Sequence, residues 1–245
     1  MGETTTTIPM KKYLLFGLLA LLAGPLSAAD ASPKDDVNNA AKKLSDSANY
    51  SWHTTVVVPE DAQFKPGPTD GKTEKGGFTY VKLSFGDNTT EFVKKGESAA
   101  ITDPDDKWQS LTNLENNSEG PGRFMVPMVK NFKAPDAQAV QLAAAAKELK
   151  KASDVYSSDL TEDGAKEMMT FGGRRGGGPT ITNPSGSVKF WIKDGVLTKY
   201  EFKVKGTMSI NDNPIDVDRD TTVEIKDVGS TRIAVPDEAR KKLSS

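Results

Sequence analysis

The chain contains no cysteine and a single histidine, His53. Without cysteine it can form no disulfide and no cysteine-ligated zinc or iron–sulfur centre, and it has no thiol nucleophile. One imidazole cannot build a multi-histidine metal centre. Neither sign of charge is in excess, because 32 Lys and Arg face 34 Asp and Glu and leave a formal net charge of −2. That balance gives no overall field to attract nucleic acid or an anionic membrane. The length of 245 residues suits one large domain or two small ones.

Motifs for catalysis are also missing. The sequence has no Gly-x-Ser-x-Gly nucleophile elbow, no His-Glu-x-x-His zinc motif and no phosphate loop ending in Gly-Lys-Ser/Thr. Four aspartates, Asp212, Asp216, Asp218 and Asp220, lie close together in a pattern that invites a calcium hypothesis, but the glycine and glutamate of an EF-hand are absent. We therefore predict a protein that is not an enzyme and that holds no cofactor or metal, with His53 as a structural residue of a strand.

The first thirty residues have the pattern of a secretory signal peptide. A basic pair, Lys11 and Lys12, precedes an apolar run over 13–23, which a Gly-Pro break and several small residues follow. The run is shorter than the roughly 20 residues that span a bilayer comfortably. We therefore expect export through the inner membrane and no membrane-spanning segment.

The boundaries of this segment follow from its small residues. Cleavage is expected after Ala29, with Ala28 or Ala31 as alternatives, so that residues 1–29 are the signal peptide. Translation is expected to begin at Met10, since an acidic residue before the basic pair is unusual in such a signal. No cysteine stands at the cleavage site to carry acyl chains. The mature protein is thus predicted to be soluble, and periplasmic or secreted.

Patterning after the signal peptide predicts a single α+β domain over 30–245. Ser32, followed by proline and two acidic residues, is the expected N-cap of a helix that runs to about Leu44. The stretch 59–77 is rich in proline, glycine and charge and predicts a long exposed, flexible loop. Alternating apolar residues predict strands from Tyr50 and over 78–85, 89–94 and 99–102.

The middle of the chain changes character. The alanine-rich stretch 136–152 predicts a helix, residues 155–160 a brief strand, and Thr161 the N-cap of a second helix. The stretch 171–179, with its run of glycines around two arginines, predicts a second flexible loop.

The last third predicts an antiparallel meander. Asp194-Gly195 suits a type I′ hairpin turn between strands over 188–192 and 196–208. A turn over 211–216 and a strand over 220–226 follow, and a final helix begins after Pro236. In the strand over 196–208 the apolar residues share one face and the charged ones the other, which predicts a sheet with a buried and a solvated face.

The hairpin Phe190–Tyr200, with its Asp-Gly turn followed by Leu-x-Lys-aromatic, and the tail Thr221–Gly229 with Ile233-x-Val235-Pro236 carry a family resemblance. They resemble the periplasmic lipoprotein-carrier superfamily of LolA/LolB-like half-barrels, which includes LppX-like lipid-binding lipoproteins and the sensor domains of RseB-like regulators. The chain is also similar to uncharacterised secreted bacterial proteins with a Gly-Arg loop. The missing acylated cysteine departs from the LolB and LppX pattern and fits a soluble carrier like LolA.

The resemblance implies a strongly bent antiparallel sheet, a half-barrel, with helices packed on its concave face. Such a groove would take a hydrophobic ligand, a lipid or the acyl chains of a lipoprotein, and its expected lining is Val81, Leu83, Phe85, Tyr200, Phe202 and Val204. Arg174 and Arg175 of the Gly-Arg loop are the candidate contact to an anionic headgroup. The alternative is a non-enzymatic envelope sensor or interaction module that binds a protein partner with the same sheet.

Overall fold

The computed structural model describes residues 1–3, 32–62, 65–86, 88–116, 122–170, 179–210 and 213–244, and within them every side chain except those of 85, 122–124 and 210. Residues 31–245 form one compact unit, to which residues 1–30 do not belong. The predicted signal peptide over 1–29 lies almost wholly outside the described residues, and so does most of the predicted loop over 171–179.

The compact unit consists of strands and six described helices. The N-terminal strands are β1 Asn49–Val57, β2 Pro66–Glu74, β3 Thr79–Phe85, β4 Asn88–Lys95, β5 Ser98–Thr102 and β6 Trp108–Ser110. The later strands are β7 Lys150–Ala152, β8 Val155–Asp159, β9 Thr180–Lys193, β10 Val196–Ile210 and β11 Asn213–Lys226. The helices are α1 Pro33–Asp46, α2 Leu111–Asn116, α3 Gly122–Lys130, α4 Pro135–Ala145, α5 Glu162–Met169 and α6 Asp237–Leu243.

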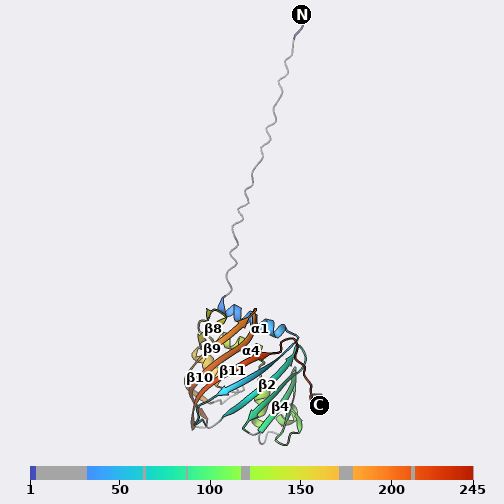
Figure 1. Cartoon of the computed structure of the whole chain (residues 1–245), viewed down its shortest axis with the longest axis vertical. Helices are drawn as coiled ribbons and strands as arrows, with labels where there is room; N and C mark the ends of the chain where they lie inside the picture. Colours follow the sequence, from blue (N-terminus) through green and yellow to red (C-terminus); the bar gives the residue numbers. More distant parts are fainter. Residues whose placement is uncertain are drawn as a thin grey trace. The chain divides into compact units, whose positions relative to one another are not determined.

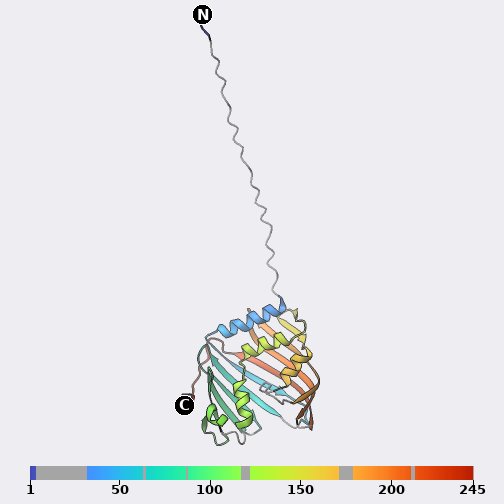
Figure 2. The ribbon, with the colours of Figure 1, turned by 180° about the vertical axis from the view of Figure 1, so that it is seen from behind.

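All of these strands belong to one open antiparallel sheet in the order β6-β5-β4-β3-β2-β1-β11-β10-β9-β8-β7. Two meanders, β1–β6 and β7–β11, are joined where β1 pairs with β11. The sheet is strongly curved, and α1, α4 and α5 lie over its inner face (Figures 1 and 2). This arrangement confirms the predicted α+β half-barrel.

The connection between the two meanders explains why helices cover the concave face. Strands β6 and β7 are the two opposite edges of the sheet, so the chain between them must cross from one edge to the other. Helices α2, α3 and α4 make up most of that crossing. Their apolar side chains and those of the strands form one core cluster, because the apolar faces of both layers lose contact with water only against each other.

Several local predictions are confirmed. Ser32 caps α1 in a capping box, in which its hydroxyl accepts from the amide of Asp35 at 3.2 Å and its amide donates to the Asp35 carboxylate at 3.2 Å. Thr161 likewise caps α5. Asp194 and Gly195 both have positive φ, 54° and 73°, which is the backbone that a type I′ turn requires.

The prediction of a long exposed loop over 59–77 is wrong for residues 66–74, which form β2. This strand pairs with β1 on one side and β3 on the other. Proline and glycine weaken its local preference for a strand, but the ladders on both sides satisfy its backbone. Pro66 is the first residue of the strand and lies at a register shift, where no ladder donor is needed.

Two other boundaries also differ from prediction. The helix expected over 136–152 ends at Ala145, and its last three residues form β7, which pairs with β8. The turn expected over 211–216 is shorter, because β11 begins at Asn213, which already pairs with Ile210 of β10. In both places the hydrogen bonds to the adjacent strand of a hairpin outweigh the local pattern.

The opposite face of the sheet is also covered at its N-terminal end. Val93, Ala100 and Trp108 point away from the concave face and pack against Val235 and Ala239 beside and within α6. Their strand neighbours Phe92 and Ile101 belong to the concave core. The β4 and β5 strands are therefore buried on both faces, and the C-terminal helix is part of the fold.

Asp46, at the end of α1, joins that helix to the turn after β2. Its carboxylate accepts from Lys42 at 2.6 Å and from Lys75 at 2.9 Å. These two hydrogen bonds lower the pKa of Asp46 from its ordinary 3.8 to about 2. Since the folded-state pKa is depressed, the stability that the pairs contribute is complete above pH 3.8 and is lost as the pH falls through about 2.

We expect Lys75→Met to raise the pKa of Asp46 toward 3.8, because one of the two ammonium donors disappears. An NMR titration of the Asp46 side-chain carboxyl measures this directly. Lys72→Met, three residues earlier on β2, is the control and should leave the titration of Asp46 unchanged. An unchanged Asp46 pKa in Lys75→Met would show that this pair does not persist in solution.

Candidate functional site

The residues predicted to line a ligand groove lie on the concave face of the sheet. Val81, Tyr200 and Val204 are fully buried, Phe202 is 6% exposed, and Leu83 is partly buried against the same core. The side chain of Phe85 lies outside what the structure describes. The structure thus places five of the six residues in one continuous apolar cluster, beneath the helices.

Protein side chains fill the concave face in this structure. Helix α4 contributes mostly small residues to the core, Ala139, Ala143 and Ala145, together with Leu142. Toward the other edge, Phe132 stacks on Trp52 with ring centroids 6.2 Å apart and meets the edge of Phe92 at 5.1 Å. The predicted groove residues therefore belong to the same apolar core as the side chains of α4.

Two tyrosines of the sheet fasten α4 to the concave face. The hydroxyl of Tyr50 on β1 donates to the carboxylate of Asp136 at 2.5 Å, and the hydroxyl of Tyr200 on β10 donates to the amide oxygen of Gln138 at 2.5 Å. Burial, followed by the charge of Asp136, raises the pKa of both phenols well above its ordinary value. Both phenols are therefore neutral hydrogen-bond donors throughout the ordinary pH range.

The other two helices over this face are fastened by polar contacts as well. Tyr156 on β8 donates to the carboxylate of Asp36 on α1 at 2.8 Å. Arg219 on β11 points to the concave face and donates to the main-chain carbonyl of Met168, in the last turn of α5, at 2.6 Å. Burial lowers the pKa of Arg219 to about 10, so the guanidinium still carries its charge at neutral pH.

A separate surface pocket of about 340 Å³ lies beside α1, away from the predicted groove. Residues of one stripe of α1 and of the two hairpin turns after β7 and β9 line it. Sequence reasoning missed it, because its walls come from segments more than a hundred residues apart. The only signal in the sequence was the spacing of Asp36 and Lys43, which places both on one face of a helix.

The single histidine lies on the outer face of the sheet. The imidazole Nδ1 of His53 is 2.7 Å from the carboxylate of Asp70 on the neighbouring strand, and the two side chains are 34% and 67% exposed. His53 on β1 and Asp70 on β2 lie directly opposite each other. Asp70 is the partner of His53 that the sequence did not reveal. His53 therefore lies in a strand, as predicted, and its role as a structural residue stays a prediction.

The aspartate cluster on β11 is matched by lysines on β10. Lys203 lies 2.7 Å from Asp220 and 3.3 Å from Asp218, and Lys205 lies 2.8 Å from Asp218. Among the described residues, no group of three or more acidic or histidine side chains is placed to hold a metal ion.

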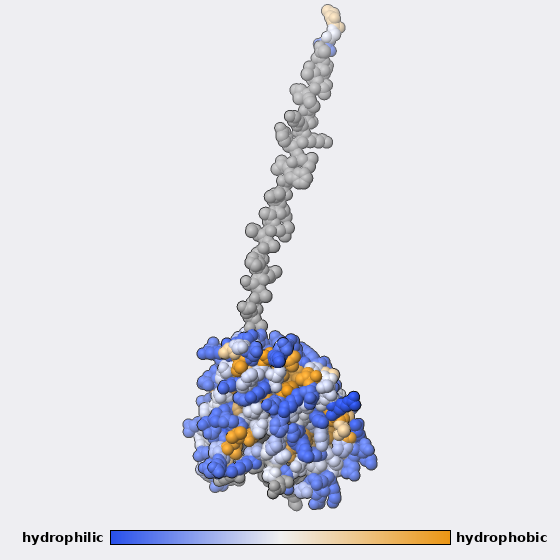
Figure 3. Space-filling view, in the orientation of Figure 1, coloured by the Kyte–Doolittle hydropathy of each residue, from blue (hydrophilic) through white to orange (hydrophobic). Residues whose placement is uncertain are grey.

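The face of the molecule in Figure 3 is mostly hydrophilic, with apolar residues in separate patches.

Two further predictions concern the Gly-Arg loop and the absence of a membrane-spanning segment. Arg174 and Arg175 lie outside the described residues, so their contact with an anionic headgroup stays a prediction. No helix in the part of the chain that the structure describes is long and apolar enough to span a membrane.

The fold and the concave face together define an open antiparallel half-barrel with helices seated in its groove. Two solved structures are similar to this chain. LprF from Mycobacterium bovis matches at 11% identity with a TM-score of 0.46, over 84% of this chain and 97% of that one. The Mycobacterium tuberculosis lipoprotein LppX matches at 8% identity with a TM-score of 0.47, over 83% of this chain and 98% of that one.

LppX is also the name of one of the groups that the sequence resemblance cites. At these identities the likeness concerns the course of the chain and says nothing of a ligand. No family model matches the sequence, and no curated protein matches it.

Proposed function

We propose that this protein is exported and binds a hydrophobic ligand, a lipid or the acyl chains of a lipoprotein, between the concave face of its sheet and α4. To admit the ligand, α4 would move away from the groove residues. Binding would be passive, since the apolar surface of an acyl chain leaves water at roughly 25 cal/mol per Å² before ordering costs are subtracted. The proposal includes no catalytic step.

The observation that carries the proposal is the way α4 is attached. Its buried face is built mainly of alanines, which interlock only shallowly with the large side chains of the sheet. Two phenol hydrogen bonds, to Asp136 and Gln138, hold it in addition. A helix held in this way can leave the sheet at a lower cost than one anchored by large apolar side chains, because each methylene group left unburied costs about 0.8 kcal/mol.

Removing one phenol hydrogen bond should therefore speed ligand entry. A hydrogen bond to a charged group contributes about 1.5–3 kcal/mol, so Tyr50→Phe is expected to accelerate the uptake of a fluorescent fatty acid about tenfold. Stopped-flow fluorescence measures the rate. Tyr80→Phe is the matched control, because Tyr80 also donates to a carboxylate, that of Glu91, but contacts none of the three helices over the groove.

The proposal fails if the wild-type protein takes up no fatty acid and if mass spectrometry of an organic extract of the purified protein finds no lipid. That pair of results would favour the alternative, an interaction module that binds a protein partner. Equal acceleration by Tyr50→Phe and Tyr80→Phe would contradict the role of α4.

A further inference from the structure

The surface pocket beside α1 has one preorganised wall. The carboxylate of Asp36 accepts from the hydroxyl of Tyr156 at 2.8 Å and from the ammonium of Lys151 at 3.3 Å. The Tyr156 side chain is 3% exposed, and Lys151 lies over its ring, 5.0 Å from the centroid. These contacts fix the three side chains to one another, so this wall needs no rearrangement when a molecule enters.

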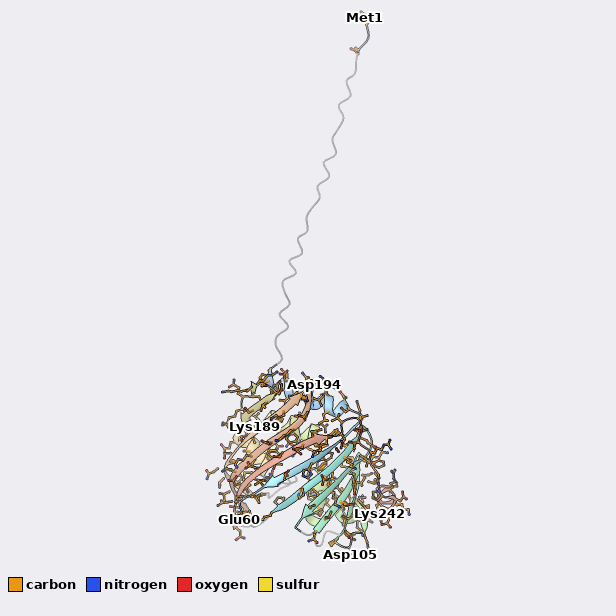
Figure 4. The ribbon with its side chains drawn as sticks, in the orientation of Figure 1. Met1, Glu60, Asp105, Lys189, Asp194 and Lys242 are labelled. Carbon is orange, nitrogen blue, oxygen red and sulfur yellow. The ribbon has the colours of Figure 1, made fainter. Side chains whose placement is uncertain are left out.

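Three other charged groups around the pocket have no partner. Lys43 on α1, Asp154 in the turn after β7 and Asp194 at the tip of the β9–β10 hairpin (Figure 4) all line it. Within the described ranges, the side chains of these three residues form no hydrogen bond and no ion pair. This contrasts with the outer face of the sheet, where opposite charges pair across β10 and β11.

The position of Lys43 depends on the hairpin below it. Its ammonium approaches Gly195 so closely that a Cβ atom at that position would collide with it. Gly195 has a φ of 73°, which its lack of a side chain permits. Gly195 thus permits both the positive φ of the turn and the close approach of the Lys43 ammonium. The ammonium therefore lies at the mouth of the pocket.

We propose that this pocket binds a small zwitterion, whose ammonium group lies at the carboxylates of Asp154 and Asp194 and whose oxyanion lies at Lys43. The volume of about 340 Å³ is at the lower end of the range for small-molecule sites. Two carboxylates and one ammonium without a protein partner are complementary to a ligand that carries both signs of charge. Neither an acyl chain nor a simple anion satisfies all three groups. The inference is independent of the proposed groove under α4.

Two sources supply this chemistry, a free compound such as an amino acid and the headgroup of phosphatidylethanolamine. Phosphoethanolamine represents their shared chemistry, with ethanolamine and inorganic phosphate as its two halves. We expect phosphoethanolamine to shift the amide signals of Lys43, Asp154 and Gly195 in a saturable NMR titration, and to bind more tightly than either half. Cosedimentation with vesicles of phosphatidylethanolamine then distinguishes a membrane headgroup from a free ligand.

Charge-assisted hydrogen bonds are strong enough that Lys43→Met and Asp194→Asn should each weaken binding about tenfold. Lys42→Met is the matched control for the first, because Lys42 is the preceding residue on α1 and pairs with Asp46 instead. Asp106→Asn is the control for the second, because Asp106 also has a positive φ, 61°. The proposal is overturned if phosphoethanolamine does not saturate the signals, if phosphate alone binds equally well, or if the controls weaken binding as much as the pocket variants.

Discussion

Phe202→Ala is expected to lower the free energy of unfolding by about 3–5 kcal/mol, the usual cost of removing a buried aromatic side chain. Phe202 lies on the concave face between Val188 of β9 and Thr221 of β11, which pair with it directly, and it is only 6% exposed. Removing the ring leaves a cavity that the surrounding strands cannot close. Denaturant unfolding measures the change, and in thermal unfolding it corresponds to a fall in Tm of roughly 10 °C.

Val57→Ala is the control for this variant, because Val57 is apolar but 62% exposed, and its replacement should cost less than about 0.5 kcal/mol. A loss below about 1 kcal/mol for Phe202→Ala would contradict the close packing of the concave face. It would mean that the groove around Phe202 is already open in solution. The same experiment with a fatty acid present tests whether a ligand restores the lost stability.

Gly71→Val is expected to destabilise the protein by about 3 kcal/mol, at the upper end of the usual cost of overpacking a core. Gly71 pairs directly with Trp52 across β1 and β2, and the indole ring lies across the glycine. A Cβ atom at Gly71 would overlap ring carbons of Trp52, whose side chain is 4% exposed and has no space to retreat into. The measurement is again the midpoint and slope of denaturant unfolding.

The partner in this collision can be tested by a double-mutant cycle. In a Trp52→Leu background the ring is absent, so we expect Gly71→Val to cost at least about 1 kcal/mol less than in the wild type. Additive costs would show that the effect of Gly71→Val arises elsewhere in β2. The cycle also tests whether β2 is a strand of the folded protein in solution.

The closed groove and the charged pocket place different demands on the chain. In the groove, fully buried residues such as Tyr200 combine an apolar body with a hydroxyl that must find a partner, and α4 supplies it. In the pocket, the side chains of Lys43 and Asp154 lie at the surface, where water solvates them. In the two proposals, a ligand of the groove would displace a helix, whereas a ligand of the pocket would displace only water.

The sequence by itself determined those features that neighbouring residues decide. Ser32 caps α1 because its partner is three residues away, Asp194-Gly195 turns because both residues tolerate a positive φ, and the alternation along β10 separates its apolar face from its charged one. Each depends on interactions within a few residues or on the period of a single element. The six groove residues followed from this alternation and from the family resemblance, not from any knowledge of what lies over them.

Only the tertiary structure decided the rest. Residues 66–74 have weak strand preference and become a strand because β1 and β3 satisfy the backbone on both sides. Asp36 meets Tyr156 from 120 positions away, and α4 fills the concave face because the chain must cross from one sheet edge to the other. Contacts between distant segments form only when the whole core is assembled, so no local pattern encodes them, and the pocket beside α1 exists only where three such segments meet.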